Sequence, residues 1–350
     1  MKQEPFHIGT TVIAPGTQRI VELPIAHLYT HTEMSLTTHV IHGRRPGPRL
    51  FVSAALHGDE INGVEIIRRL LKRKSLGQLR GTLIAIPIIN SFGFINHSRY
   101  LPDRRDLNRV FPGSESGSLA SRIANLFMRE IAAHCTHGID LHTGSNHRFN
   151  LPQIRASLND NETLRLAKAF GAPVMLHSKT RDGSLREAVA DLGIPMLLYE
   201  AGEALRFDEL SIRTGLRGII TVMRAIGMLP EKPSRRTHPV FHSSVSKWVR
   251  APISGILSRC IDIGAQVEKG EIIALVHDPY GETEMKIPAP VSGVIIGRIQ
   301  LPLVHQGDAL FHIAVLKGDP DAGQIIEELA SDFEYTDFRR PTDGRQDFAP

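Results

Sequence analysis

The residues of this chain best suited to chemistry are a histidine and a carboxylate that follow a buried apolar run. Residues 51–67 read FVSAALHGDEINGVEII, so His57 and Glu60 interrupt two apolar patterns. Their spacing lets an imidazole and a carboxylate converge on one point, and both are ligands that Zn²⁺ accepts. A catalytic zinc ion typically takes three protein ligands and keeps one position for water, so a third ligand is required elsewhere.

His142 is the best candidate for the third ligand. It ends another apolar run, and Asp140 lies two residues before it. Residues two apart on a strand share a face, so Asp140 could orient the imidazole of His142 or reach across to His57. The predicted cofactor is one Zn²⁺ per chain, although two nitrogens and one carboxylate also admit Mn²⁺, Co²⁺ or Fe²⁺.

A further carboxylate, Glu200, also follows a predicted strand. Ligands bind at the carboxyl ends of strands in open α/β sheets, so His57, His142 and Glu200 are expected at one edge. Each also has a purely structural explanation. His57 and Glu60 could stabilise the start of a helix, and His142 could be a hydrogen-bonded core histidine. Glu200 could pair with a basic residue.

An arginine-rich segment at residues 98–113, SRYLPDRRDLNRVFPG, reads as a loop bounded by proline and glycine. Arginine binds a carboxylate through a planar fork, and a neighbouring asparagine adds neutral donors. An arginine of this loop, with the asparagine beside it, could therefore bind a carboxylate group. The alternative is a solvated loop held by Arg–Asp pairs. Substrate selectivity is expected to depend on further loops at 146–154 and 203–210.

Apolar runs alternate with helical patterns over the first two thirds of the chain, which predicts an α/β fold. The economical architecture is a mostly parallel mixed sheet flanked by helices. Strands are expected at 49–55, 82–86, 138–141, 173–176 and 195–199, and helices at 61–74, 118–134, 160–170, 184–192 and 213–227.

The last third has a different pattern, with short β-like runs separated by glycine and proline. APISG at 251–255 recurs as APVSG at 289–293, and two related halves predict a small all-β barrel or sandwich domain. The proline-rich segment 229–239 is interpreted as a linker. The predicted domains are 1–232 (catalytic), 233–320 (β-rich) and 321–350 (a fraying tail).

Four motifs, LHGDE, RDLNRVFPG, DLHTG and YEAGE, occur in this order within residues 45–230. Together they resemble the succinylglutamate desuccinylase/aspartoacylase family, relatives of the zinc carboxypeptidases. The resemblance implies a zinc-carboxypeptidase-like fold, with His57, Glu60 and His142 as the zinc ligands.

The same resemblance implies roles for four other residues. Glu200 would be the general base and acid, and Glu200-Ala-Gly202 matches the family's Glu-x-Gly form, which favours Glu200 over the nearby Glu203. Asn108 and Arg109 would hold a substrate carboxylate, and Arg99 would polarise the scissile carbonyl.

The expected function is zinc-dependent hydrolysis of an amide bond in an N-acyl amino acid or a related carboxylate-bearing small molecule. A metallocarboxypeptidase acting on peptide C termini uses the same chemistry and stays open. So does a non-catalytic carboxylate-binding module. The overall composition argues against other functional classes, such as nucleic-acid-binding proteins. Lys+Arg 41 against Asp+Glu 37, with no long basic run, does not indicate a nucleic-acid partner.

No apolar run approaches the roughly 18 residues of a membrane span, and two cysteines cannot form a disulfide framework. A cytoplasmic location without a membrane partner is the expectation. The β-rich region resembles biotinyl/lipoyl domains, but Lys286 follows the turn signal at 278–281, so no attached group is expected. This domain could shape the pocket mouth, limit substrate size or form a homo-oligomer interface.

Overall fold

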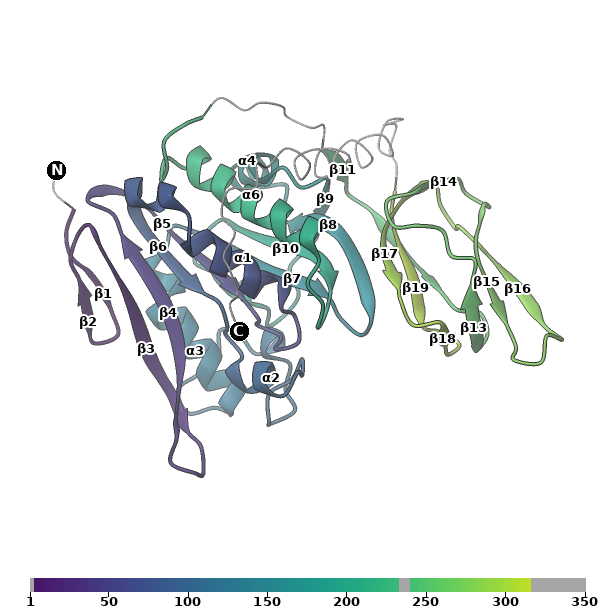
Figure 1. The fold of residues 1–350 in the computed structure, drawn as a ribbon, viewed down its shortest axis with the longest axis horizontal. Helices are drawn as coiled ribbons and strands as arrows, with labels where there is room; N and C mark the ends of the chain where they lie inside the picture. Colours follow the sequence, from purple (N-terminus) through teal and green to yellow (C-terminus); the bar gives the residue numbers. More distant parts are fainter. Residues whose placement is uncertain (1–2, 233–239, 316–350) are drawn as a thin grey trace, which may run out of the picture.

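A large mixed β-sheet with helices on both faces forms most of the molecule, and a β-rich unit extends it on one side (Figure 1). The computed structural model describes residues 3–232 and 240–315. The predicted tail and most of the predicted linker lie outside these residues. No helix in the described ranges is long and apolar enough to cross a membrane.

Four parallel strands form the centre of the sheet, in the order β10, β7, β5, β6. They are β5 (Arg45–Ala54), β6 (Arg80–Ile86), β7 (His137–Gly144) and β10 (Met196–Glu203). Such strands are buried on both faces and read as nearly continuous apolar runs, which is why the sequence identifies them. The predicted α/β class, with a mixed sheet flanked by helices, is confirmed.

Side chains of the central strands alternate between two cores. In β5, Leu50 and Val52 belong to one core and Phe51 to the other. The first core is covered by α1 (Asn62–Leu71), α4 (Asn161–Phe170) and α6 (Glu209–Ala225), and the second by α3 (Leu119–Glu130) and α5 (Leu185–Asp191). Ser53, on the same side of β5 as Phe51, is in register with Asp140 of β7. This register places a polar pair beside the second core.

The antiparallel strands on either side of this centre were not among the sequence predictions. One side ends with β4 (Glu33–His42) and β3 (Thr17–His27), and the other continues through β8 (Arg148–Ala156), which pairs antiparallel with β10. Strand β8 also pairs, in parallel, with β9 (Val174–His177), which the sequence predicted at 173–176. The predicted loop at 146–154 is therefore wrong. In β8, Asn150, Pro152 and Arg155 interrupt the apolar pattern, so the strand has little local signal.

Several short elements lie outside the central strands and the helices that cover them. They are β1 (Phe6–Ile8), β2 (Thr11–Ile13), β11 (Phe241–Ser243), β14 (Gln266–Val267), β18 (Leu303–Val304), α2 (Ser91–Ile95), and the 3₁₀ turns Lys74–Gln78, Leu107–Arg109 and Ala132–His134. Strand β11 runs parallel to β9, so the chain returns to the main sheet before it enters the β-rich unit.

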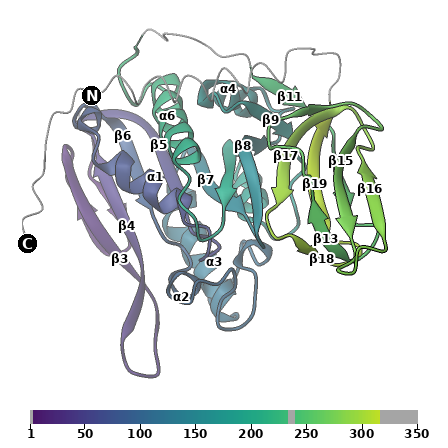
Figure 2. The same cartoon turned by 45° about the vertical axis from the view of Figure 1, so that its right-hand side comes forward.

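The β-rich unit is a two-layered arrangement with its own core (Figure 2). One layer is a four-stranded sheet of β16 (Glu284–Pro288), β15 (Ile272–His277), β13 (Gly255–Ser258) and β18. The other contains β12 (Ser246–Arg250), β19 (Ala309–Val315) and β17 (Gly293–Ile299). Strand β17 pairs with β8, so this layer continues the central sheet. The unit is thus tied to the main sheet through β8.

The internal repeat predicted from the sequence has a structural counterpart. Ala251 and Ala289, which begin the two copies, are both buried. The carbonyl of Ala251 accepts from Gly307 N–H and that of Ala289 accepts from Gly270 N–H, each at 2.8 Å. The first residue of each copy is therefore hydrogen-bonded to a glycine in a turn elsewhere in the unit. Lys286 lies within β16, after the turn, as predicted.

Candidate active site

The carboxyl ends of the central parallel strands carry three of the residues that the sequence singles out. His57 follows β5, His142 lies near the end of β7, and Glu200 lies in β10. Glu200 is in register with His142 on the neighbouring strand. Because parallel strands end at the same edge of a sheet, segments far apart in the chain meet there.

A tight turn between β5 and α1 brings Glu60 back to His57. The N–H of Glu60 donates to the carbonyl of His57 at 3.1 Å. A Cβ at Gly58 would lie 2.0 Å from the carbonyl carbon of Gly93, so only glycine fits at this position. The close backbone approach therefore explains the glycine between the two polar side chains.

His57, Glu60 and His142 form a buried cluster with the composition of a metal site. Ligand atoms from the three residues lie within 4.8 Å of one another. The Nδ1 atoms of His57 and His142 each lie 2.8 Å from a different oxygen of Glu60. The N–H of Thr143 also donates to this carboxylate, at 3.1 Å. None of the three clustered side chains has more than marginal exposure.

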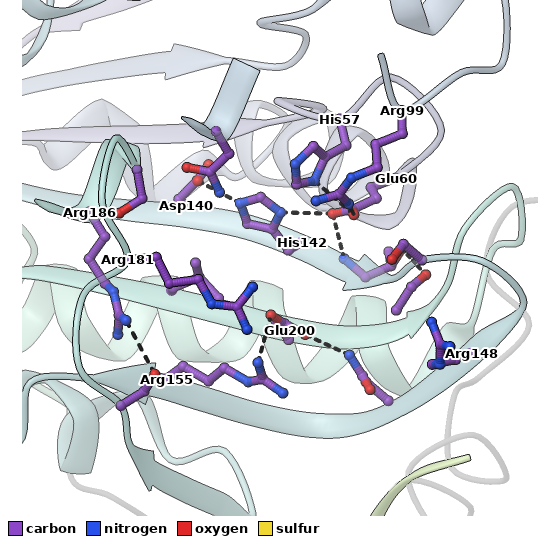
Figure 3. A pocket seen from close by; sticks show the side chains of 18 of the residues that line it. His57, Glu60, Arg99, Asp140, His142, Arg148, Arg155, Arg181, Arg186 and Glu200 are labelled. Atoms are coloured by element: carbon purple, nitrogen blue, oxygen red, sulfur yellow. Dashed lines mark hydrogen bonds and ion pairs between the residues drawn. The ribbon is translucent and has the colours of Figure 1, made fainter. Parts of the chain in front are cut away.

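Two further carboxylates hold the other nitrogen of each histidine. Asp140 Oδ2 lies 2.7 Å from His142 Nε2 (Figure 3), and Asp106 Oδ1 lies 3.1 Å from His57 Nε2. The Ser53 hydroxyl donates to Asp140 at 2.7 Å. A carboxylate on Nε2 keeps the proton there and leaves the Nδ1 lone pair for a metal. The residues present therefore fit a metal ion such as zinc, which His57, Glu60 and His142 would hold.

Charge also holds the cluster together. Burial opposes ionisation of Glu60, but the two imidazoles keep the pKa of its carboxyl well below the ordinary value. Burial likewise opposes protonation of His142, but the charges of Asp140 and Glu60 raise its pKa well above the usual range. For His57, burial is outweighed mainly by Glu60, and the pKa is raised. A divalent cation would replace the Nδ1 protons as the positive partner of Glu60.

If the cluster binds a divalent metal ion, replacing Asp106 with alanine is expected to weaken that binding by about 10- to 100-fold, as is typical for a carboxylate that orients a metal-binding histidine. The reason is that His57 loses the acceptor that fixes its ring. Competition with a chromogenic chelator measures the affinity. Asp103→Ala is the matched control, because Asp103 lies in the same loop and accepts from the backbone N–H groups of Arg105 and of Ala120 in α3, but contacts neither histidine. Equal weakening in both variants would indicate loop instability instead.

Arg99 lies beside the metal cluster and is fixed by two carboxylates. Its Nη1 is 3.2 Å from Glu60 Oε1 and its Nη2 is 2.9 Å from Asp106 Oδ2. The side chain is 17% exposed and lines the cavity, so part of its guanidinium stays accessible to a ligand. This position is compatible with a donor to a substrate carbonyl.

Asn108 and Arg109 lie in the 3₁₀ turn of the arginine-rich loop and line the same cavity. Asn108 Oδ1 accepts from the N–H of Leu185 at 3.0 Å, which leaves its Nδ2 group for a ligand. Arg109 is exposed and donates through Nη1 to the carbonyl of Asn108 at 2.5 Å. No carboxylate in the described ranges lies within ion-pair distance of Arg109, so its guanidinium is open to an anion.

Glu200 is separate from the metal cluster and has its own partners on β8. Asn150 Nδ2 donates to it at 2.6 Å, and Arg155 Nη1 lies 3.5 Å from it. The nearby Glu203 instead faces His147, at 3.7 Å, and is not among the residues that line the cavity. The structure therefore brings Glu200, and not Glu203, to the cavity shared with the metal cluster.

These groups line one cavity of about 220 Å³. Figure 3 shows His57, Glu60 and His142 along one side of it and Glu200 across from them. The β-rich unit contributes Trp248, whose ring stacks on His312 at a centroid distance of 4.1 Å. The wall of the cavity is thus built from both parts of the chain.

Comparison with known proteins agrees with this geometry. Residues 46–226 match the model of the succinylglutamate desuccinylase/aspartoacylase catalytic domain. The chain belongs to the succinylglutamate desuccinylase/aspartoacylase family. The match spans more than half of the chain and contains all the site residues predicted from the sequence.

Individual relatives extend the similarity beyond the catalytic domain. The N-alpha-acetyl-L-2,4-diaminobutyric acid deacetylase of Halomonas elongata is 26% identical over 329 residues, covering 89% of this chain and 96% of the relative. The product-bound ectoine utilization protein EutE (DoeB) from Ruegeria pomeroyi superposes with a TM-score of 0.77 at 25% identity, covering 86% of this chain and 95% of that one. A family member from Rhodobacter sphaeroides gives a TM-score of 0.77 at 24% identity, covering 86% and 96%.

The sequence predicted the metal-binding, catalytic and carboxylate-binding residues that line the cavity. It gave no role to several other residues of the cavity. It also gave no role to Asp106, which holds His57 from outside the cavity lining; the one available signal was its place within the motif RDLNRVFPG. The remaining members had no local signal, because they depend on strand pairing and loop position: Asn150, Arg155, Arg181, Arg186 and Trp248.

Proposed function

We propose that this family member is a zinc-dependent amidohydrolase that removes the acyl group from an N-acyl amino acid or a related carboxylate-bearing small amide. The observation that carries the proposal is the convergence of His57, Glu60 and His142 in the same cavity as Glu200. One zinc ion would be held by the first three residues. The deacetylase from Halomonas elongata supports an N-acyl amino acid as the substrate class.

In this proposal Glu200 moves the protons. Zinc in such sites acidifies water and polarises carbonyl groups. Glu200 accepts a proton from the attacking water, whose oxygen forms the new bond to the amide carbon. When the C–N bond breaks, the same carboxyl returns the proton to the amine nitrogen, which leaves a carboxylic acid and an amine. Asn150 and Arg155 keep this carboxylate oriented towards the cavity.

The other predicted residues position the substrate. Arg99 donates to the amide carbonyl oxygen, where negative charge develops in the transition state. Asn108 Nδ2 and the Arg109 guanidinium bind the carboxylate of the amino acid, since both have unused donors facing the cavity. Holding both ends of the substrate fixes the scissile bond between the metal cluster and Glu200.

A carboxypeptidase would use the same groups but would need room for a peptide on the amino side of the scissile bond. The cavity of about 220 Å³ is below the size range of about 300–1,000 Å³ that is typical of sites for larger ligands. Trp248 also contributes to its wall. The small volume favours a small N-acyl amino acid over a peptide.

The test is a substrate panel assayed with the full-length, zinc-loaded protein. N-acetyl and N-succinyl amino acids are expected to be hydrolysed, whereas peptides of four residues with the same C-terminal amino acids are expected to release no amino acid. Activity should be lost on dialysis against a chelator and return with zinc. Faster release from the peptides would favour the carboxypeptidase, and carboxylate binding without hydrolysis of any amide would favour the non-catalytic module.

A further inference from the structure

A second cavity lies at the amino ends of β5 and β6, at the edge of the sheet opposite the metal cluster. Its volume is about 1140 Å³. The walls come from the turn between β4 and β5, the turn after α1 and the segment that follows α6. Backbone hydrogen bonds join these walls: the N–H of Gly43 donates to the carbonyl of Gly81 at 2.8 Å, and that of Arg80 to the carbonyl of Met228 at 2.9 Å. The cavity is therefore a fixed feature of the fold.

The lining of this second cavity is strongly positive. Its one carboxylate is that of Glu231, and six cationic residues line it as well: Arg44, Arg45, Arg73, Lys74, Arg80 and Arg224. Within residues 3–232 and 240–315, no hydrogen bond or ion pair involves the side chain of any of the six. Positive charge gathered in a concave site raises the local potential and attracts anions.

Two of these cations lie beside each other in the sheet. Arg45 and Arg80 are partners in the parallel register of β5 and β6, so their side chains start from the same face. Arg44 joins them from the preceding turn, where a Cβ at Gly16 would lie 2.6 Å from its Cγ. The stem of Arg44 therefore packs against this glycine. Like charges on paired strand positions are destabilising, and an anion bound between them would offset the repulsion.

Helix dipoles account for only part of the charge. Arg224 lies in the last turn of α6 and Arg73 follows the end of α1, where a cation stabilises the helix C-terminus. Arg44, Arg45 and Arg80 belong instead to strand ends and the turn between strands, and sheets have only small net dipoles. Their shared position in one cavity is explained by a ligand that carries several negative charges.

The lining also indicates the chemistry of the anion. Guanidinium groups bind phosphate oxygens through paired hydrogen bonds, and six cations exceed what a single carboxylate can use. Four apolar residues that line the cavity are at most 8% exposed: Ile41, Leu76, Leu79 and Leu229. The volume of about 1140 Å³ slightly exceeds the range of about 300–1,000 Å³ that is typical of small-molecule sites. A concave site of this size suits a small molecule better than a flat bilayer or a nucleic-acid duplex.

We propose that this second cavity binds a polyphosphate anion, such as the di- or triphosphate chain of a nucleotide. The arginines hold the phosphate oxygens, and the buried apolar residues provide a surface for an attached nucleoside. The proposal is independent of the proposed deacylase function, because no residue lines both cavities.

Calorimetric titration of the full-length protein with ATP, tripolyphosphate and inorganic phosphate tests the site. ATP and tripolyphosphate are expected to bind at about one per chain, more tightly than inorganic phosphate. Their affinity should fall as salt is added, because exposed charges are screened. Tighter binding of ATP than of tripolyphosphate would assign the ligand to nucleotides, and equal affinity would assign it to the phosphate chain alone. If neither binds, the proposal is wrong.

The double variant Arg45→Met/Arg80→Met keeps the apolar stems and removes two charges from the strand ends. It is expected to weaken binding of ATP and tripolyphosphate about 10-fold or more, as for lost hydrogen bonds to charged groups. Arg122→Met/Lys168→Met is the matched control, because it removes two exposed cations from α3 and α4, outside both cavities. This control should bind like the wild type.

Three results would contradict the site. Equal weakening by the cavity variant and its control would indicate general charge attraction. Binding that is lost in Arg109→Met but kept in Arg45→Met/Arg80→Met would place the anion in the active-site cavity. Binding of phosphatidylserine vesicles or single-stranded DNA through the same arginines, without binding of ATP or tripolyphosphate, would assign the surface to a macromolecule. Arg44→Met/Arg73→Met repeats the test if the first variant does not fold.

Discussion

Replacing Glu200 with glutamine is expected to lower kcat for amide hydrolysis by about 100- to 10,000-fold, the usual contribution of a general acid–base group. A glutamine has nearly the shape of the glutamate but cannot take a proton from water. Its side-chain oxygen can still accept from Asn150, which lies 2.6 Å from Glu200. Folding and zinc content should therefore be unchanged, and steady-state kinetics should show the loss in kcat more than in KM.

Glu203→Gln provides the matched control. It makes the same chemical change three residues away, where the side chain faces His147 outside the cavity lining. Activity close to that of the wild type is expected. If Glu203→Gln is inactive and Glu200→Gln is active, Glu203 is the general acid–base group. That result would contradict the assignment of Glu200.

The wild-type chain is expected to be purified with about one zinc ion, and the double variant His57→Ala/His142→Ala with none. Two of the three ligands are removed, and a single carboxylate does not retain the ion. Elemental analysis of proteins purified without added metal measures the difference. Amide hydrolysis should fall to background, because water activation and carbonyl polarisation are lost together.

Removing two buried histidines also leaves Glu60 and Asp140 without their histidine partners, so thermal unfolding must accompany the metal analysis. Glu60→Gln is a milder second variant that keeps the side-chain volume. The control His147→Ala/His305→Ala changes two exposed histidines and should retain the zinc. If the folded wild-type protein takes up no zinc when zinc is supplied, the hydrolase proposal is wrong. A carboxylate-binding module would then be the remaining alternative.

Helices and buried parallel strands could be predicted because their signals are local. The helix predicted at 160–170 is observed at Asn161–Phe170, with Asp160 capping its first turn and Gly171 ending it at a φ of +70°. Apolar periodicity and cap residues act within a few residues of each other, so one sequence contains them. The same holds for the strand ends that carry His57 and His142.

Strand β8 shows why other elements could not be predicted. Its pattern of Asn150, Pro152 and Arg155 resembles a loop, yet it pairs with β10 on one side and β17 on the other. The stabilisation comes from hydrogen bonds to strands that lie far away in the sequence. Tertiary context of this kind overrides local propensity, and it also places Asn150 and Arg155 beside Glu200.

By itself, the sequence determined the α/β class and the types and spacing of His57, Glu60 and His142, because a turn and a strand end position them locally. The tertiary structure decided how the carboxylates are distributed: Asp140 holds His142, and Asp106 reaches His57 from the arginine-rich loop. It also brought cationic residues from separate elements together in a second cavity. Such groups form through packing between segments that lie far apart in the sequence. Because charge interactions between distant residues do not produce a periodic sequence pattern, the sequence alone did not predict them.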